Sequence, residues 1–169
     1  MVTLGFRIPK SILRGHRKVD DLIEYAGPVL SLYRDADGNP LLRYWANNDD
    51  DVNRWLIVPI TLEHLNSYLS RKISLRELLL SPEGGAVILL DTNDDQEPTK
   101  LTLLQAPEIP SDYLPRDDSF YSFGYRYYSH SSFSSNSLIS AEYPELSEFT
   151  IGEDGILTHT SSTEAILLQ

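Results

Sequence analysis

Two short acidic runs contain the residues whose types could do chemistry. Residues 49–51 are three consecutive aspartates, and Asp94, Asp95 and Glu97 form a second group. Carboxylate oxygens are the ligands that magnesium and calcium prefer, so the two runs could jointly hold a cation, and a metal-dependent hydrolase could use residues 49–51 or 91–97. Adjacent acids rarely converge on one ion without ligands from elsewhere in the fold. We therefore interpret both runs as solvated turns and keep the hydrolase as an alternative.

The other arrangements typical of catalysis each lack a necessary member. The chain contains no cysteine, which excludes a thiol nucleophile and cysteine-ligated zinc. It has no G-x-S-x-G turn, H-E-x-x-H pair, P-loop or G-x-G-x-x-G motif. Asp91, Glu97 and Lys100 resemble part of a metal nuclease site, but Pro98 stands where the paired acid is required. We predict no catalytic, cofactor-binding or metal-ligating residue and no cofactor, which favours a protein that is not an enzyme.

Aromatic side chains are concentrated late in the chain. Residues 119–140 contain nine serines and seven aromatic residues, and their aromatic positions alternate strictly at first, as in a strand. Base-stacking surfaces come with basic grooves, yet Arg126 is the only cation in residues 119–129. Tyrosine buries a large area at a small entropic cost, which suits protein contact. The candidate protein-contact residues are Tyr121, Phe123, Tyr125, Tyr127 and Tyr128.

Charge is distributed unevenly along the chain. The net charge is −11, and residues 1–18 carry five basic residues and no acid, so residues 19–169 carry −16. An acidic body repels phosphate backbones, which disfavours direct nucleic-acid binding and suggests an acidic mimic or neutraliser of a nucleic-acid-binding protein. No apolar run reaches the roughly 18 residues of a membrane span. Without a secretory signal or cysteine, we expect a cytoplasmic protein.

The core elements are predicted from local patterns. Apolar or alternating runs indicate strands at residues 29–34, 41–46, 54–60, 86–90 and 101–104, and residues 22–25 form a short strand or a lead-in. Pro59 cannot donate to a ladder and should lie near a strand end. A calcium loop beginning at Asp35 would need glycine at its sixth position, where Pro40 stands. The turn formers at residues 35–40 therefore predict a hairpin.

Two helix starts lie between the third and fourth of these strands. Thr61 is a suitable N-cap, and apolar residues recur at helical spacing after it. Ser74 and Glu77 have the spacing of a capping box. Ser81-Pro82 ends the second helix, and two glycines release the chain.

The expected fold is α+β, with a mostly antiparallel sheet of about five strands and two short helices in the order β-β-β-α-α-β-β. An irregular, β-leaning C-terminal region should follow, with short strands near residues 149–151 and 156–157. We divide the chain into a basic N-terminal arm (1–18), an α+β core domain (19–106) and a Pro/Ser/Tyr-rich extension (107–169). The extension should pack on the core or on a partner.

Part of the core also resembles a known family. Between residues 21 and 91 the chain is similar to an uncharacterised bacterial domain-of-unknown-function family of small α+β proteins. The matching features are Glu24-Tyr25 with Gly27-Pro28-Val29-Leu30, the strand Trp55-Leu56-Ile57-Val58-Pro59-Ile60, and the helix start Lys72-Ile73-Ser74-Leu75-Arg76-Glu77. The resemblance implies a bacterial origin and a fold. It implies no activity, because the family has no catalytic assignment.

Together these features predict a non-enzymatic protein-interaction module or accessory subunit of a bacterial complex. A defence or toxin–antitoxin system is one setting for it. A protein partner or self-association is expected, and a membrane span is not. The acidic mimic and the metal-dependent hydrolase remain the alternatives.

Overall fold

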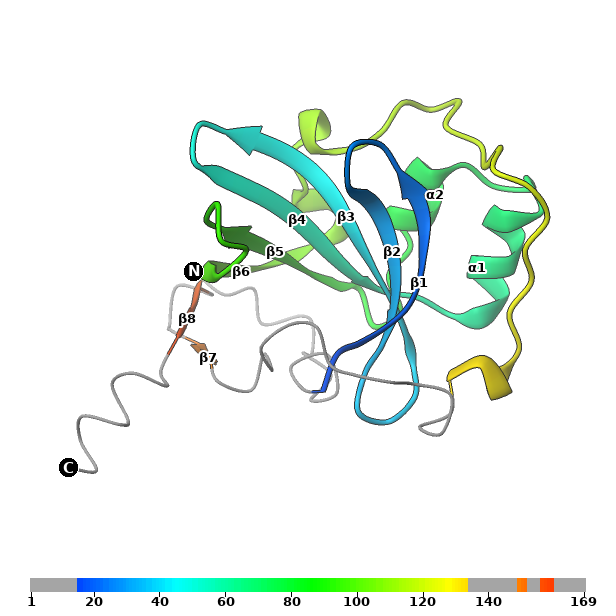
Figure 1. The fold of residues 1–169 in the computed structure, drawn as a ribbon, viewed down its shortest axis with the longest axis horizontal. Helices are drawn as coiled ribbons and strands as arrows, with labels where there is room; N and C mark the ends of the chain where they lie inside the picture. The colour runs from blue at the N-terminus through cyan, green and yellow to red at the C-terminus, as the bar shows by residue number, and fades with distance from the viewer. Residues whose placement is uncertain (1–14, 134–148, 152–155, 160–169) are drawn as a thin grey trace.

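A single antiparallel sheet organises the molecule (Figure 1). The computed structural model describes residues 15–133, 149–151 and 156–159. Six strands follow one another across the sheet in chain order: β1 (Arg17–Glu24), β2 (Pro28–Arg34), β3 (Pro40–Asp49), β4 (Val52–Pro59), β5 (Ala86–Thr92) and β6 (Pro98–Gln105). Two short strands, β8 (Ile156–His159) and β7 (Phe149–Ile151), extend the sheet beyond β6. Most of the predicted basic arm and the serine-rich residues 134–140 lie outside the described residues.

The predicted fold class is confirmed, but about five strands was too low a count, because six strands lie within residues 17–105. The sequence pattern did not predict the full length of β1, because this strand begins with charged residues and buries only Leu22 deeply. Backbone hydrogen bonds form the ladder whatever the side chains are, and β1 lies at the edge of the sheet. Polar residues at the strand ends also hid the full lengths of β3 and β5.

Both predicted helix starts are confirmed. Thr61 caps α1 (Leu62–Leu69) by accepting a hydrogen bond from the His64 backbone at 3.1 Å. Ser74 and Glu77 form the capping box of α2 (Leu75–Leu79). Three short 3-10 helices follow, at Ala106–Glu108, Ser111–Tyr113 and His130–Phe133. Within the described residues, no helix is long and apolar enough to cross a membrane.

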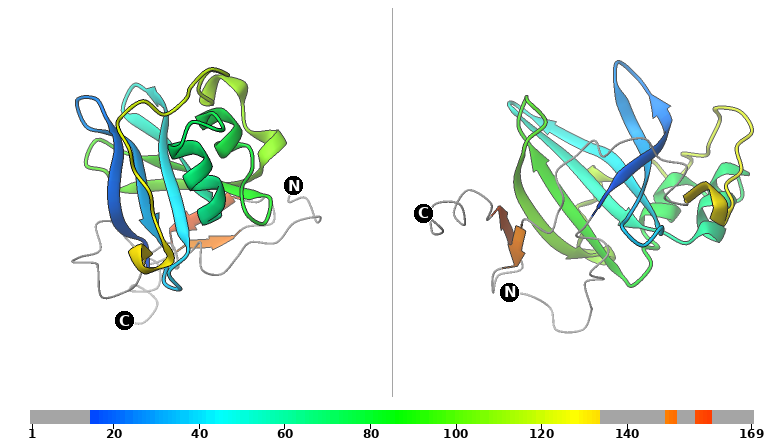
Figure 2. Two further views of the ribbon diagram at one scale, coloured as in Figure 1. Left: turned by 90° about the vertical axis from the view of Figure 1, so that its right-hand side faces the viewer. Right: turned by 60° about the horizontal axis from the view of Figure 1, so that its bottom comes forward.

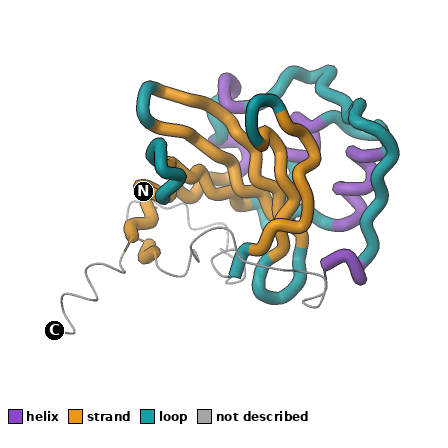
Figure 3. The backbone as a smooth tube through the Cα atoms, in the orientation of Figure 1, coloured by secondary structure: helices purple, strands orange, loops and turns teal. Residues whose placement is uncertain are grey.

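The helices lie on one side of the sheet (Figure 3). Buried side chains line both of its faces. On one face Leu42 and Leu56 pack with both helices and with residues between 109 and 133. On the other face Leu41, Ile57 and Ile88 belong to a second buried cluster. This two-sided burial explains why the sequence of β4 is apolar in a continuous run rather than in alternation. Pro59 closes β4, as expected.

Three hairpin tips lie at the same end of the sheet (Figure 2). They join β1 to β2, β3 to β4 and β5 to β6, at residues 25–27, 50–51 and 93–97. The predicted β2–β3 hairpin is at the opposite end, where the Asp35 carboxylate accepts hydrogen bonds from the backbones of Asp37 and Asn39, each at 2.9 Å. The alternating antiparallel order therefore gathers loops that are distant in sequence.

Candidate functional site

The aromatic segment, residues 120–133, crosses α1 and the edge strand β1 as an extended loop (Figures 1 and 2). The strict alternation of its aromatic residues predicted a strand, and that prediction was wrong. Side chains, rather than a backbone ladder, hold this segment to the rest of the protein. Of the four alternating aromatic residues, Tyr121 is buried, whereas Phe123, Tyr125 and Tyr127 are exposed.

Tyr121 anchors the start of the segment in the core. Its side chain is 2% exposed, and its ring lies edge-on to Tyr68 with 5.4 Å between centroids. Burial raises the pKa of both phenols, and the nearby Asp20 carboxylate adds to the rise at Tyr121 while Arg126 opposes it. Both tyrosines are therefore neutral core residues at ordinary pH.

Asp20 on β1 fastens the middle of the segment. Its carboxylate accepts a hydrogen bond from Arg126 Nη1 at 2.7 Å and one from the Tyr128 hydroxyl at 2.6 Å. Arg126 also donates to the Asp21 carbonyl at 3.0 Å. Burial and the hydrogen bond to the Asp20 carboxylate raise the pKa of Tyr128 to about 12. One acid on the edge strand thus holds two residues of the segment.

The end of the segment is held by α1 and by the core. Asn66 on α1 forms two hydrogen bonds with the Tyr128 backbone, at 2.8 and 3.0 Å. Phe133 is buried, and its ring centroid lies 6.2 Å from that of Tyr128. We call Tyr121, Arg126, Tyr128 and Phe133 the clamp residues. They pin the segment at its start, middle and end.

Between these anchors, three aromatic side chains point to solvent. Phe123, Tyr125 and Tyr127 are 53%, 89% and 65% exposed. The five predicted contact residues therefore divide into two buried or half-buried anchors and three exposed rings. Tyr125 and Tyr127 border a groove of about 610 Å³, here called the α1 groove, which is lined by Leu62, Glu63, Asn66, Ser67, Ser70, Lys72, Tyr125, Arg126, Tyr127 and His130.

Most of the residues that line the α1 groove are of polar types. Among the described residues that line it, Leu62 is the only aliphatic one, whereas small-molecule sites are predominantly apolar. Tyrosine, serine and asparagine make up half of the described lining residues, and these types are common in surfaces that recognise proteins. Lys72 offers a positive group, Glu63 offers a negative one, and Arg126 is already paired with Asp20. The groove can therefore make many polar contacts with another chain.

The two acidic runs lie on neighbouring hairpin tips. Arg54 lies 3.7 Å from Asp49 in the first run and 3.4 Å from Asp91 in β5, so one cation already offsets part of the first run's charge. Asn93 closes the second tip by accepting two backbone hydrogen bonds at 3.0 Å. Among the described residues, no three histidine or acidic side chains are grouped so that they could hold a metal ion. This geometry gives the metal-dependent hydrolase no support.

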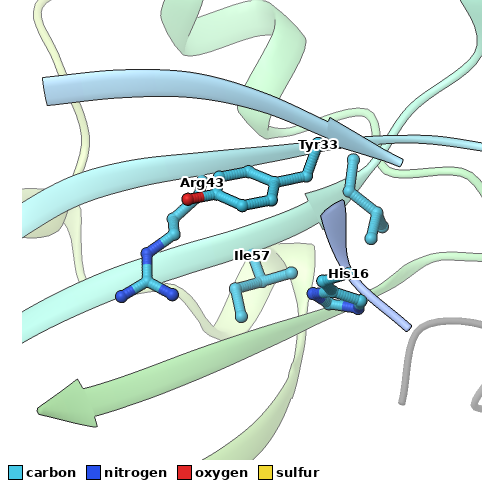
Figure 4. A pocket seen from close by; sticks show the side chains of 5 residues that line it. His16, Tyr33, Arg43 and Ile57 are labelled. Atoms are coloured by element: carbon cyan, nitrogen blue, oxygen red, sulfur yellow. The ribbon is translucent and has the colours of Figure 1, made fainter. Parts of the chain in front are cut away.

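A buried polar cluster was missed at the level of sequence. His16 and Arg43 are buried beside Tyr33 on the sheet face away from the helices, on either side of Ile57 in Figure 4. The Arg43 guanidinium carbon lies 4.6 Å from the Trp55 ring centroid. The cavity between them is about 10 Å³, at the lower limit for one water molecule. The cluster therefore belongs to the core packing and offers no room for a ligand.

Comparisons with known proteins agree with the sequence resemblance and extend it over more of the chain. A search of curated proteins and a search of solved structures each found no match to this chain. One family model matches residues 8–131, which includes most of the aromatic segment as well as the core. The chain therefore belongs to a family of unknown function, DUF6575.

Proposed function

We propose that this protein is a non-enzymatic interaction module that binds a protein partner through Phe123, Tyr125, Tyr127 and the α1 groove. The observation that carries the proposal is that these rings are exposed to solvent while the backbone beneath them is held in place. The exposed rings stand on a segment whose neighbouring residues are clamped into the core and onto β1. Rings that lie mostly in water, as those of Tyr125 and Tyr127 do, add little to the stability of the fold, so this arrangement favours a role in contact with another molecule.

Pre-organisation makes such a surface effective. Binding costs free energy when side chains and loops must be ordered, and the clamp residues have already ordered this segment. Tyrosine has few rotatable bonds for its size, which keeps the remaining cost small. Among the described residues, residues 121–127 make no backbone hydrogen bond to another backbone group. An extended segment of a partner could therefore pair with them while its side chains contact the rings.

The expected setting is an accessory subunit of a bacterial complex in the cytoplasm. We would examine defence and toxin–antitoxin systems first. The family carries no catalytic assignment, and the α1 groove has the polar, tyrosine-bearing composition of a protein contact. The partner could also be a second copy of this chain that binds through the same surface. The experiment below distinguishes this self-association from binding to a different protein.

The test uses the full chain and the double variant Tyr125→Ser with Tyr127→Ser. Each protein is used for capture from lysate of the source organism at low and high salt, and each stoichiometric partner is then purified and titrated by calorimetry. Loss of two exposed tyrosines at a contact should weaken binding by about tenfold or more. The matched control is Leu80→Ser, which changes another exposed apolar residue far along the chain.

Circular dichroism and thermal unfolding establish that all variants fold. A partner that binds the double variant as tightly as the wild type would overturn the proposal. Absence of any stoichiometric partner, together with a monomeric mass in light scattering, would also overturn it. A dimer that the double variant abolishes would identify a second copy of this chain as the partner.

A further inference from the structure

The three hairpin tips together line a small hollow. It has a volume of about 200 Å³ and is lined by Tyr25, Ala26, Gly27, Pro28, Trp45, Asn53, Trp55 and Gln96. The first tip contributes residues 25–28, the second hairpin contributes the tryptophans and Asn53, and the third contributes Gln96. We call it the hairpin-tip hollow. Its tryptophan Trp55 belongs to the buried cluster on the sheet face away from the helices, so the hollow is separate from the α1 groove.

The indole N–H groups of both tryptophans in the hollow already donate hydrogen bonds. The Trp45 indole donates to Asn53 at 3.1 Å, and the Trp55 indole donates to Thr92 at 3.1 Å. Trp55 is largely buried and already contacts the Arg43 guanidinium. Tyr25, which is 82% exposed, and Trp45, which is 37% exposed, are therefore the rings that remain available to a ligand.

Negative charge surrounds these rings. The tip segments 24–28, 48–53 and 93–97 carry one, three and three acidic residues and no basic one. All seven are exposed: Glu24, Asp49, Asp50, Asp51, Asp94, Asp95 and Glu97. Among them Asp49 has a cationic partner in Arg54 at 3.7 Å. The remaining field attracts cations and repels anions, and it reaches roughly a Debye length of 8 Å at physiological salt.

We infer that the hairpin-tip hollow binds an arginine side chain from a basic segment of a protein partner. A guanidinium stacks on aromatic faces, and the surrounding carboxylates favour its charge. The volume is below the roughly 300–1,000 Å³ of small-molecule sites, which fits one long side chain better than a free metabolite. Charge complementarity selects a basic partner and excludes nucleic acid. This site goes beyond the proposed function, because it uses another surface and another chemistry.

Tryptophan fluorescence of the protein itself can measure binding at this site. It has two tryptophans, and both line the hollow, so intrinsic fluorescence reports occupancy directly. The probe is a short glycine–serine peptide carrying three arginines, titrated against the full-length protein. Matched peptides carry lysine or glutamate at the same positions. We expect a saturable fluorescence change with the arginine peptide, weaker binding of the lysine peptide and none of the glutamate peptide.

Variants locate the binding. The double variant Tyr25→Ser with Trp45→Leu should weaken arginine-peptide binding roughly five- to tenfold, measured by anisotropy of a labelled peptide. Tyr125→Ser with Tyr127→Ser is the matched control and should leave that affinity unchanged. Failure of the proposed function would therefore leave this test intact. An unchanged affinity in the hollow variant, or equal binding of the glutamate peptide, would overturn the inference.

The basic arm of the same chain is the competing occupant. In a third variant Arg7, Lys10 and Arg14 are replaced by serine. If the arginine peptide binds only after these replacements, the arm fills the hollow and the inference of a partner segment is overturned. If binding is the same with and without the arm charges, the hollow is open to a partner.

Discussion

The aromatic segment and the hairpin tips both hold aromatic rings in solvent, but they support them by different means. Tyr125 stands on a loop that side chains fasten, through Tyr121 in the core and Asp20 on β1. Tyr25 stands on a turn that closes a backbone ladder, in which Glu24 pairs with Pro28. Both rings are exposed to solvent. Specific side chains hold the backbone that carries Tyr125, whereas main-chain hydrogen bonds hold the backbone that carries Tyr25.

This difference determines where a substitution acts. A change at a clamp residue should alter stability and the position of the exposed rings together. A change at a tip ring should alter binding alone, because the ladder beneath it remains intact. The predictions below test this contrast, beginning with the largest expected effect.

Replacing the buried anchor should be most damaging. Tyr121→Ala removes a ring from the core and leaves a cavity beside Tyr68, which should lower the free energy of unfolding by about 3–5 kcal/mol. Urea unfolding monitored by circular dichroism measures the loss. Phe120→Ala is the control at a neighbouring, 40% exposed aromatic residue, and it should cost less than half as much. Equal costs would contradict the anchor role of Tyr121.

Weakening the fastening on β1 should have a smaller and more local effect. Asp20→Asn removes the charge that holds Arg126 and should cost about 1 kcal/mol, since the Asp20 side chain is partly exposed. Hydrogen exchange should become faster at the Tyr128 amide, which donates to the Asn66 side chain, and stay unchanged in β3 and β4. Asp37→Asn changes an exposed acid on the β2–β3 turn and should leave both regions unaltered. Uniform exchange changes across the sheet would count against a local clamp.

Alkaline pH should loosen the same fastening. The pKa of Tyr128 is raised in the folded protein from its ordinary 10.0 to about 12, so its contribution to stability is complete below pH 10 and is lost as the pH rises towards 12. Tyr128→Phe removes this ionisation, and the free energy of unfolding should therefore fall less steeply over that interval. Denaturation series at several alkaline pH values measure the slope. Identical slopes in the two proteins would show that Tyr128 titrates normally.

Substitutions of the exposed rings should have the smallest effect on stability. Tyr25→Ser and Tyr125→Ser should each change the free energy of unfolding by less than about 0.5 kcal/mol, because both rings are largely in solvent. Thermal unfolding provides the measurement. A large loss of stability in Tyr125→Ser would mean that this ring supports the fold. The distinction between buried anchors and exposed rings within the segment would then be wrong.

Local patterns in the sequence determined much of the fold. The N-caps at Thr61 and Ser74 and the turn at Asp35 act over no more than four residues, so the residues that produce them are visible together in the chain. The alternation and length of apolar runs similarly located β2 to β6 and the antiparallel order. Membership of an uncharacterised family was also evident from the sequence.

Only the tertiary structure decided which aromatic residues are anchors and which are displayed. Alternation alone could not tell a strand from a clamped loop, because the deciding contacts join Asp20 to Arg126 and Tyr128, 106 and 108 residues apart. The hairpin-tip hollow likewise needs three turns that the sheet gathers at one end. Caps and turns depend on neighbours in the chain. The clamp residues and the hairpin-tip hollow depend on how separate elements pack against one another. That packing depends on all the side chains buried in the core together.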